Sequence, residues 1–121
     1  MPIKNILLVD DSRTDCHVIG QMLTRGGYNV VAVESAEQAL ARVGEIKPDL
    51  VLMDIVMPGQ NGFQATRELS RNEATRRIPI IICTSKRQET DRVWGMRQGA
   101  KEYMVKPIDA ADLVARIAAL G

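Results

Sequence analysis

LVLMD, residues 50–54, is the stretch that decides the fold, because four apolar residues run without a break into an aspartate. Unbroken rather than alternating hydrophobicity is typical of a strand that is buried on both faces, as in a parallel sheet. Four more short apolar runs recur along the chain: ILLV (6–9), VVAV (30–33), IIIC (80–83) and the weaker YMV (103–105). We therefore expect five parallel strands, each buried on both faces.

The segments between these runs have the apolar spacing of helices. Ser35 and Gln38 form a capping-box pattern before the second segment, and Asp109 is placed to cap the last one. The pattern is weakest in the fourth segment, where we expect Trp94 to pack against the helix layer. The (βα)₅ alternation predicts an α/β fold, an open doubly wound three-layer sandwich with right-handed crossovers. We expect one domain over residues 1–121, with no output domain.

Composition and charge narrow the function classes. The chain has 121 residues, of which 45% are hydrophobic. Its net charge of +1 creates no strong electrostatic potential that would attract nucleic acid or a membrane surface. The first apolar run is too short to span a membrane or to act as a signal sequence, so we expect a cytoplasmic protein without membrane insertion. Cys16 and Cys83 form no paired motif and are interpreted as buried free thiols.

Polar side chains follow four of the five predicted strands. Asp10 and Asp11 come after the first, Asp54 after the third, Thr84 after the fourth and Lys106 after the fifth. Each of these residues alone would be an ordinary turn or cap residue. Together they are more specific, because the carboxyl ends of parallel strands meet at one edge of the sheet, where open α/β folds bind ligands.

Three carboxylates at one edge need a cation. Two unit charges about 5 Å apart repel by roughly 3 kcal/mol at an effective dielectric constant near 20. Lys106 supplies one positive charge, and a hard divalent ion such as Mg²⁺ suits the remaining oxygen ligands. No His or Cys joins the cluster, which argues against zinc. A carboxylate beside Mg²⁺ and an ammonium group is suited to attack phosphorus, so the sequence points to phosphoryl transfer.

The motifs around these residues resemble a known family. The chain is similar over essentially its whole length to the response-regulator receiver family, of the single-domain chemotaxis-regulator type. The motifs are LLVDDS (7–12), LVLMDIVMPGQNG (50–62), IIICTS (80–85) and YMVKP (103–107). Two further stretches resemble the subgroup tied to type IV pilus twitching motility: GFQATRELS (62–70) and ETDRVWGMRQGA (89–100).

The resemblance implies a flavodoxin-like strand order of 2-1-3-4-5 and a role for each site residue. Asp54 would be the phosphoacceptor. Asp10, Asp11, Asp54 and the backbone carbonyl of Val56 would hold Mg²⁺.

Lys106 would contact the phosphoryl group, and its peptide bond to Pro107 would be cis. Thr84 would be the switch hydroxyl, and Tyr103 would be the switch aromatic that turns inward when Thr84 moves.

By the same resemblance, the chain would take its phosphoryl group from a histidine kinase or phosphotransfer protein. It would catalyse its own phosphorylation and dephosphorylation without being an enzyme toward other substrates. The signal would pass to a protein docking on the face of the fourth helix, fifth strand and fifth helix. That output would control chemotaxis-like or twitching motility.

Four alternatives stay open. The chain could be a phosphate sink for a shared kinase. It could be an aspartyl-phosphate hydrolase, although such enzymes commonly carry an aspartate where Val56 stands. It could be an FMN-binding electron carrier, although the first loop is acidic rather than rich in hydroxyls and glycine. It could also be a receiver look-alike that serves only as a scaffold.

Overall fold

The alternation of strands and helices is confirmed by the computed structural model, which describes residues 2–59 and 61–121. Met1 and Gln60, the latter within the quoted motif 50–62, lie outside the described residues. The strands are β1 (Asn5–Val9), β2 (Asn29–Val33), β3 (Leu50–Met53), β4 (Ile80–Thr84) and β5 (Glu102–Val105). The helices are α1 (Arg13–Arg25), α2 (Ala36–Ile46), α3 (Gly62–Arg71), α4 (Glu89–Arg97) and α5 (Ala110–Leu120).

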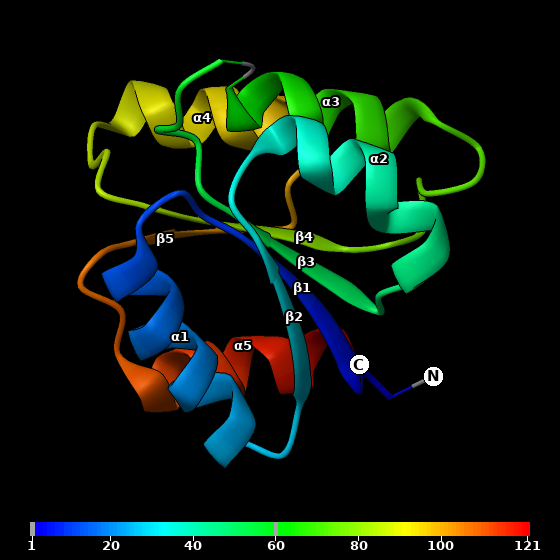
Figure 1. The fold of residues 1–121 in the computed structure, drawn as a ribbon. Coiled ribbons are helices and arrows are strands. Elements are labelled where there is room, and N and C mark those ends of the chain that lie inside the picture. The colour runs from blue at the N-terminus through cyan, green and yellow to red at the C-terminus, as the bar shows by residue number, and fades with distance from the viewer. Residues whose placement is uncertain (1, 60) are drawn as a thin grey trace.

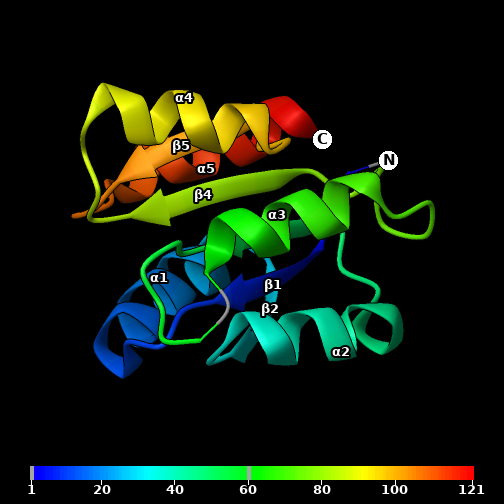
Figure 2. The same cartoon turned by 90° about the horizontal axis from the view of Figure 1, so that it is seen from above.

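The five strands form one parallel sheet in the order β2-β1-β3-β4-β5, as expected. Helices α1 and α5 cover one face of the sheet, and α2, α3 and α4 cover the other (Figure 1; Figure 2 from above). This arrangement is the flavodoxin-like three-layer sandwich. No helix within the described residues is long and apolar enough to cross a membrane.

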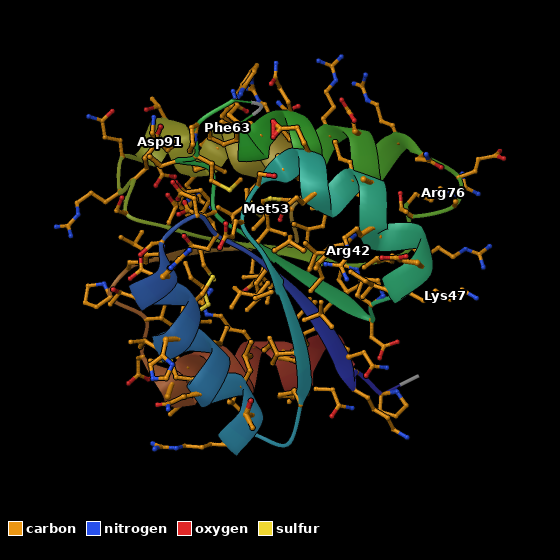
Figure 3. The ribbon with its side chains drawn as sticks, viewed as in Figure 1. Arg42, Lys47, Met53, Phe63, Arg76 and Asp91 are labelled. Carbon is orange, nitrogen blue, oxygen red and sulfur yellow. The ribbon has the colours of Figure 1, made fainter. Side chains whose placement is uncertain are left out.

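A hydrophobic core fills each side of the sheet, because neighbouring residues of a strand point to opposite faces. Leu8 and Leu52, which are paired in register, lie on the side of α1 and α5 with Leu113 and Ile117. The alternate residues of the same strands face α2 and α3: Leu7, Val9, Val51 and Met53. Figure 3 shows Met53 inside the molecule and the side chains of Arg42, Lys47 and Arg76 on its outside.

The expectation that every strand is buried on both faces is wrong for β2. This strand lies at the edge of the sheet, and of its residues only Val33 is fully buried, while Val31 is 38% exposed. An edge strand has one neighbour instead of two, and the helix layers cover it incompletely. Its apolar run therefore predicted the strand correctly but not its burial. The other edge strand, β5, buries only Met104 fully.

The helix starts follow from short polar side chains. The Ser35 hydroxyl accepts a hydrogen bond from the Gln38 backbone N–H at 3.1 Å, and the Gln38 side chain accepts one from the N–H of Glu34 at 2.9 Å. Asp109 caps α5 as expected. Helix α4 has no capping side chain, and Trp94 is 50% exposed, so its expected packing is only partial.

Candidate functional site

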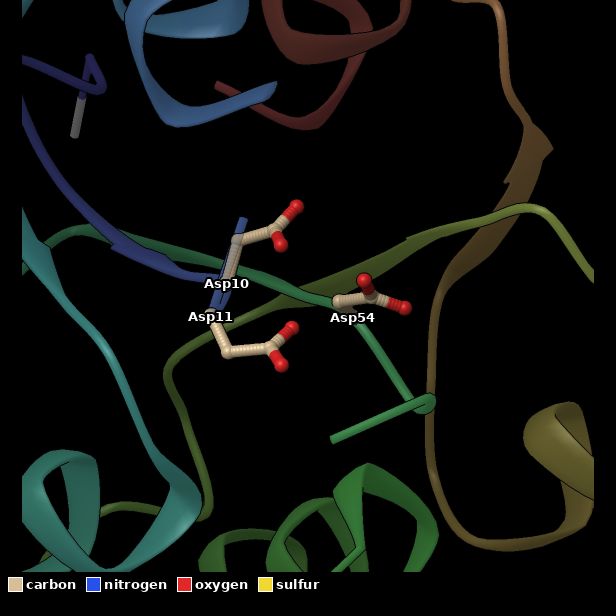
Figure 4. Close-up of side chains that lie close together, drawn as sticks. All are labelled: Asp10, Asp11 and Asp54. Atoms are coloured by element: carbon tan, nitrogen blue, oxygen red, sulfur yellow. The ribbon is translucent and has the colours of Figure 1, made fainter. Parts of the chain in front are cut away.

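Three carboxylates meet at the carboxyl edge of the sheet. Strands β1 and β3 are neighbours with Val9 opposite Met53, so the residues that follow them, Asp10 and Asp54, lie side by side. Asp11 joins them, and one oxygen of each carboxylate lies within 4.8 Å of the others. Figure 4 shows the three side chains close together, with their carboxylates projecting to the same side. The sequence prediction that they converge is confirmed.

Lys106 reaches this cluster from the loop after β5. Its Nζ donates hydrogen bonds to Asp10 Oδ2 at 2.7 Å, to Asp15 Oδ2 at 2.8 Å and to Asp54 Oδ2 at 3.1 Å. The lysine side chain is only 13% exposed, so these are largely shielded interactions. The Lys106–Pro107 peptide bond is cis, as the resemblance implied.

Asp15 is the residue that sequence reasoning missed. It lies in the first turn of α1, and the helix begins directly after the acidic loop because the Ser12 hydroxyl accepts a hydrogen bond from the Asp15 N–H at 3.2 Å. Asp15 does not lie at the end of a strand, as the predicted site residues do, but in the helix that follows β1. The signal in the sequence was the short connection, since a helix that starts at Arg13 keeps its first turn beside the site.

The two inner carboxylates are fixed by backbone groups as well as by Lys106. Asp10 Oδ1 accepts the N–H of Ser12 at 2.9 Å, and Asp54 Oδ1 accepts the N–H of Val56 at 3.0 Å. Asp10 is 1% exposed and Asp54 is 6% exposed. Both side chains are therefore held in defined positions.

The carboxylates of this cluster carry more negative charge than Lys106 can balance, and the pKa values of Asp10 and Lys106 respond to burial and to the neighbouring charges. Burial raises the pKa of Asp10, the hydrogen bond from Lys106 opposes that rise, and the charge of Asp54 adds to it. Burial alone would lower the pKa of Lys106. Its hydrogen bonds to Asp10 and Asp15, together with the negative charges of Asp54 and Asp10, outweigh burial and raise that pKa above its usual range. One ammonium group therefore faces several carboxylates that a further cation would stabilise.

The donor set fits a hard divalent cation. Within the part of the chain that the structure describes, the group able to hold a metal is Asp10, Asp11 and Asp54, all oxygen donors. Mg²⁺ prefers such oxygen ligands. Val56 contacts Asp54 in the structure through its backbone N–H. The backbone carbonyl of Val56 therefore remains a predicted ligand.

The two predicted switch residues are both hydrogen-bonded to the backbone of one residue, Lys86. Thr84 is fully buried at the end of β4, and its Oγ1 accepts a long hydrogen bond, 3.4 Å, from the N–H of Lys86. The hydroxyl of Tyr103, on β5, donates to the carbonyl of the same Lys86 at 2.9 Å. Burial raises the pKa of Tyr103 to about 12, helped by Asp91 and Asp54, so the phenol keeps its proton.

Residues 6–118 match the response regulator receiver domain family, and the chain belongs to that family. It is a receiver domain of a two-component response regulator; members of the family are phosphoacceptors rather than conventional enzymes, and they interact with histidine kinases or phosphotransfer proteins. Within the family the chain is PilH-like. It is 50% identical over 118 residues to Protein PilH of Pseudomonas aeruginosa, and the match covers 98% of each chain.

Solved structures agree with this assignment. The receiver domain of the sensor histidine kinase PA1611 from Pseudomonas aeruginosa has 35% sequence identity and a TM-score of 0.86, covering 94% of this chain and 93% of that one. That structure holds a magnesium ion in its active-site cleft. A CheY-like receiver protein from Methanospirillum hungatei has 27% identity and a TM-score of 0.86, over 95% and 90% of the two chains. The chain spans about half, 51%, of the transcriptional regulators named PhoB that it also matches.

Proposed function

We propose that Asp54 accepts a phosphoryl group from a phosphorylated histidine kinase or phosphotransfer protein. One Asp54 oxygen attacks phosphorus, a P–O bond forms, and the bond between phosphorus and the donor breaks with its electron pair leaving on the donor. The observation that carries this proposal is the placement of Asp54. Its side chain is buried and accepts hydrogen bonds from the Val56 N–H and from Lys106. It also lies beside two further carboxylates, whose mutual repulsion a bound cation would reduce.

Mg²⁺ is the proposed cofactor, held by Asp10, Asp11, Asp54 and the backbone carbonyl of Val56. When bound, it would neutralise charge on the phosphoryl oxygens. The oxygen-only donor set supports this assignment, and so does the magnesium ion in the PA1611 receiver domain.

The remaining roles belong to side chains of the chain itself. Lys106 donates an N–H to a phosphoryl oxygen, since its Nζ already contacts Asp54. The buried Thr84 hydroxyl turns toward another phosphoryl oxygen, and Tyr103 moves into the space that Thr84 leaves. Both changes act on the loop after β4, because both side chains are bonded to Lys86. The domain thereby promotes its own phosphorylation and dephosphorylation.

The proposed output is a partner protein that docks on the face of α4, β5 and α5. Apolar side chains are exposed there on α4 and β5: Val93, Trp94, Met96 and Val105. We propose that residues 1–121 form one receiver domain that acts in the cytoplasm in twitching or chemotaxis-like motility control, and the similarity to PilH supports this proposal. A phosphate sink for a shared kinase would use the same site without a docking partner.

The direct test is phosphorylation by a small acyl phosphate in the presence of Mg²⁺, followed by intact-mass measurement. The wild type should gain one phosphoryl group, and D54N should gain none. E45Q, a charge change on the surface helix α2, is the matched control and should react like the wild type. A phosphorylated D54N would disprove the assignment of Asp54. Pull-down from cell extract with and without beryllofluoride then separates an output regulator, which captures a partner only when loaded, from a sink.

A further inference from the structure

Asp15 accepts a hydrogen bond from one of the three N–H groups of the Lys106 ammonium. An ammonium group has three donors, and the three carboxylates that they reach are Asp10, Asp15 and Asp54. In this state Lys106 has no donor left for a phosphoryl oxygen. Contact with the phosphoryl group of an incoming donor, while Asp54 is still a free carboxylate, therefore requires one of the three bonds to be given up.

The three bonds differ in how easily they can be replaced. The side chains of Asp10 and Asp54 are 2% and 7% exposed, so breaking either bond would leave a buried charge without its partner. The side chain of Asp15 is 41% exposed, and water can solvate it when the lysine leaves. Asp15 also lies outside the carboxylate group that can hold a metal. Of the three hydrogen bonds, the one between Asp15 and Lys106 can be broken with the smallest loss of free energy.

We propose that Asp15 is a positioning residue that competes with the phosphoryl group for Lys106 and so slows phosphorylation of Asp54. This inference rests on the proposed function. While Asp15 holds the ammonium group, it draws Lys106 toward α1 and screens its charge from Asp54. Both consequences follow from the ion pair between Asp15 and Lys106.

Removal of the Asp15 charge has opposite effects on two measurable steps. D15N should raise the rate of phosphorylation by an acyl phosphate at saturating Mg²⁺ by about two- to five-fold, the range set by a partly exposed ion pair. The same variant should bind Mg²⁺ more weakly, because the site becomes less negative. A merely structural role would not separate the two, since a loosened site would lose both.

The experiment compares the wild type, D15N and D15E, with D112N as the matched control. Asp112 lies in the first turn of α5 and pairs with Arg116 at 3.0 Å, so D112N removes an equivalent helix charge away from the site. Initial phosphorylation rates come from intact-mass measurements, Mg²⁺ dissociation constants from calorimetry, and folding from thermal melts. D15E and D112N should match the wild type in rate, and only D15N should be faster.

A second comparison uses Lys106→Met as the background. The rate advantage of D15N should vanish there, because Asp15 acts through the lysine. A folded D15N that is phosphorylated no faster than the wild type would overturn the inference while leaving the proposed function intact, and so would an advantage that persists without Lys106. Loss of folding in D15N alone would assign Asp15 a structural role and overturn it as well. If the wild type itself takes no phosphoryl group, the proposed function fails first, and the inference fails with it.

Discussion

Replacing Asp11 with asparagine should stabilise the metal-free protein. The Asp11 carboxylate is exposed and lies within 4.8 Å of oxygens of Asp10 and Asp54. Coulomb repulsion at that distance is about 0.9 kcal/mol per pair at the dielectric constant of water and about 3.5 kcal/mol at an effective value of 20. Because Asp11 is exposed, the lower figure applies, and attraction to Lys106 offsets part of the sum. We expect D11N to raise the free energy of unfolding by about 1 kcal/mol.

The assay is urea unfolding at low ionic strength with a chelator, repeated with increasing Mg²⁺. The wild type should gain about 1.4 kcal/mol when Mg²⁺ reaches ten times its dissociation constant. D11N should gain much less, so the order of stability reverses as the metal is added. E73Q, which removes a charge in the turn after α3, should be no more stable than the wild type under either condition.

Two results would refute this reasoning. One is a D11N protein that is less stable than the wild type without metal. The other is a stability difference that survives 1 M salt, where the Debye length is about 3 Å and repulsion between exposed charges is largely screened.

Three other predictions concern the rest of the domain. G62A should cost about 1–3 kcal/mol of stability and slow phosphorylation, because a Cβ there would press on the backbone of Asp54 and Ile55; an unchanged urea midpoint would contradict this. Burial raises the pKa of the Cys83 thiol to about 12, so Ellman's reagent at pH 8 should label Cys83 no faster than the protein unfolds. The partly buried Cys16 should react first. Backbone N–H groups at the start of β1 lower the pKa of Asp49, so its stabilisation is present at neutral pH and is lost as the pH falls below about 4. D49A should therefore cost about 1 kcal/mol at pH 7 and less as the pH falls below about 4, and a loss that does not change with pH would exclude the carboxylate as the cause.

The strands could be predicted from the sequence because a buried parallel sheet needs unbroken apolar runs. The same rule failed for the burial of β2, since an apolar run does not say whether its strand has one neighbour or two. Helix α4 was the weakest prediction for a related reason. Only Gly95 is buried in it, so its sequence carries little periodic signal.

The site residues likewise divide into those that the sequence predicted and one that it did not. Asp10, Asp54 and Lys106 were found because strand ends are visible in the sequence and must share an edge of the sheet. Asp15 was missed because its contact depends on the direction in which α1 leaves the loop. That direction is set by the Ser12 cap and by packing of α1 on the sheet, which residue spacing alone does not determine.

The backbone of Lys86 ties the loop after β4 to two strands at once. Its amide is held by Thr84 at 3.4 Å and its carbonyl by Tyr103 at 2.9 Å, so the two attachments are unequal. A displaced Thr84 hydroxyl would release the amide first, and the phenol alone would then hold the loop until Tyr103 moves. Deuterium uptake at that one backbone amide would then follow the chemical state of the acidic edge, and a labelled protein could show its own activation without any partner being known.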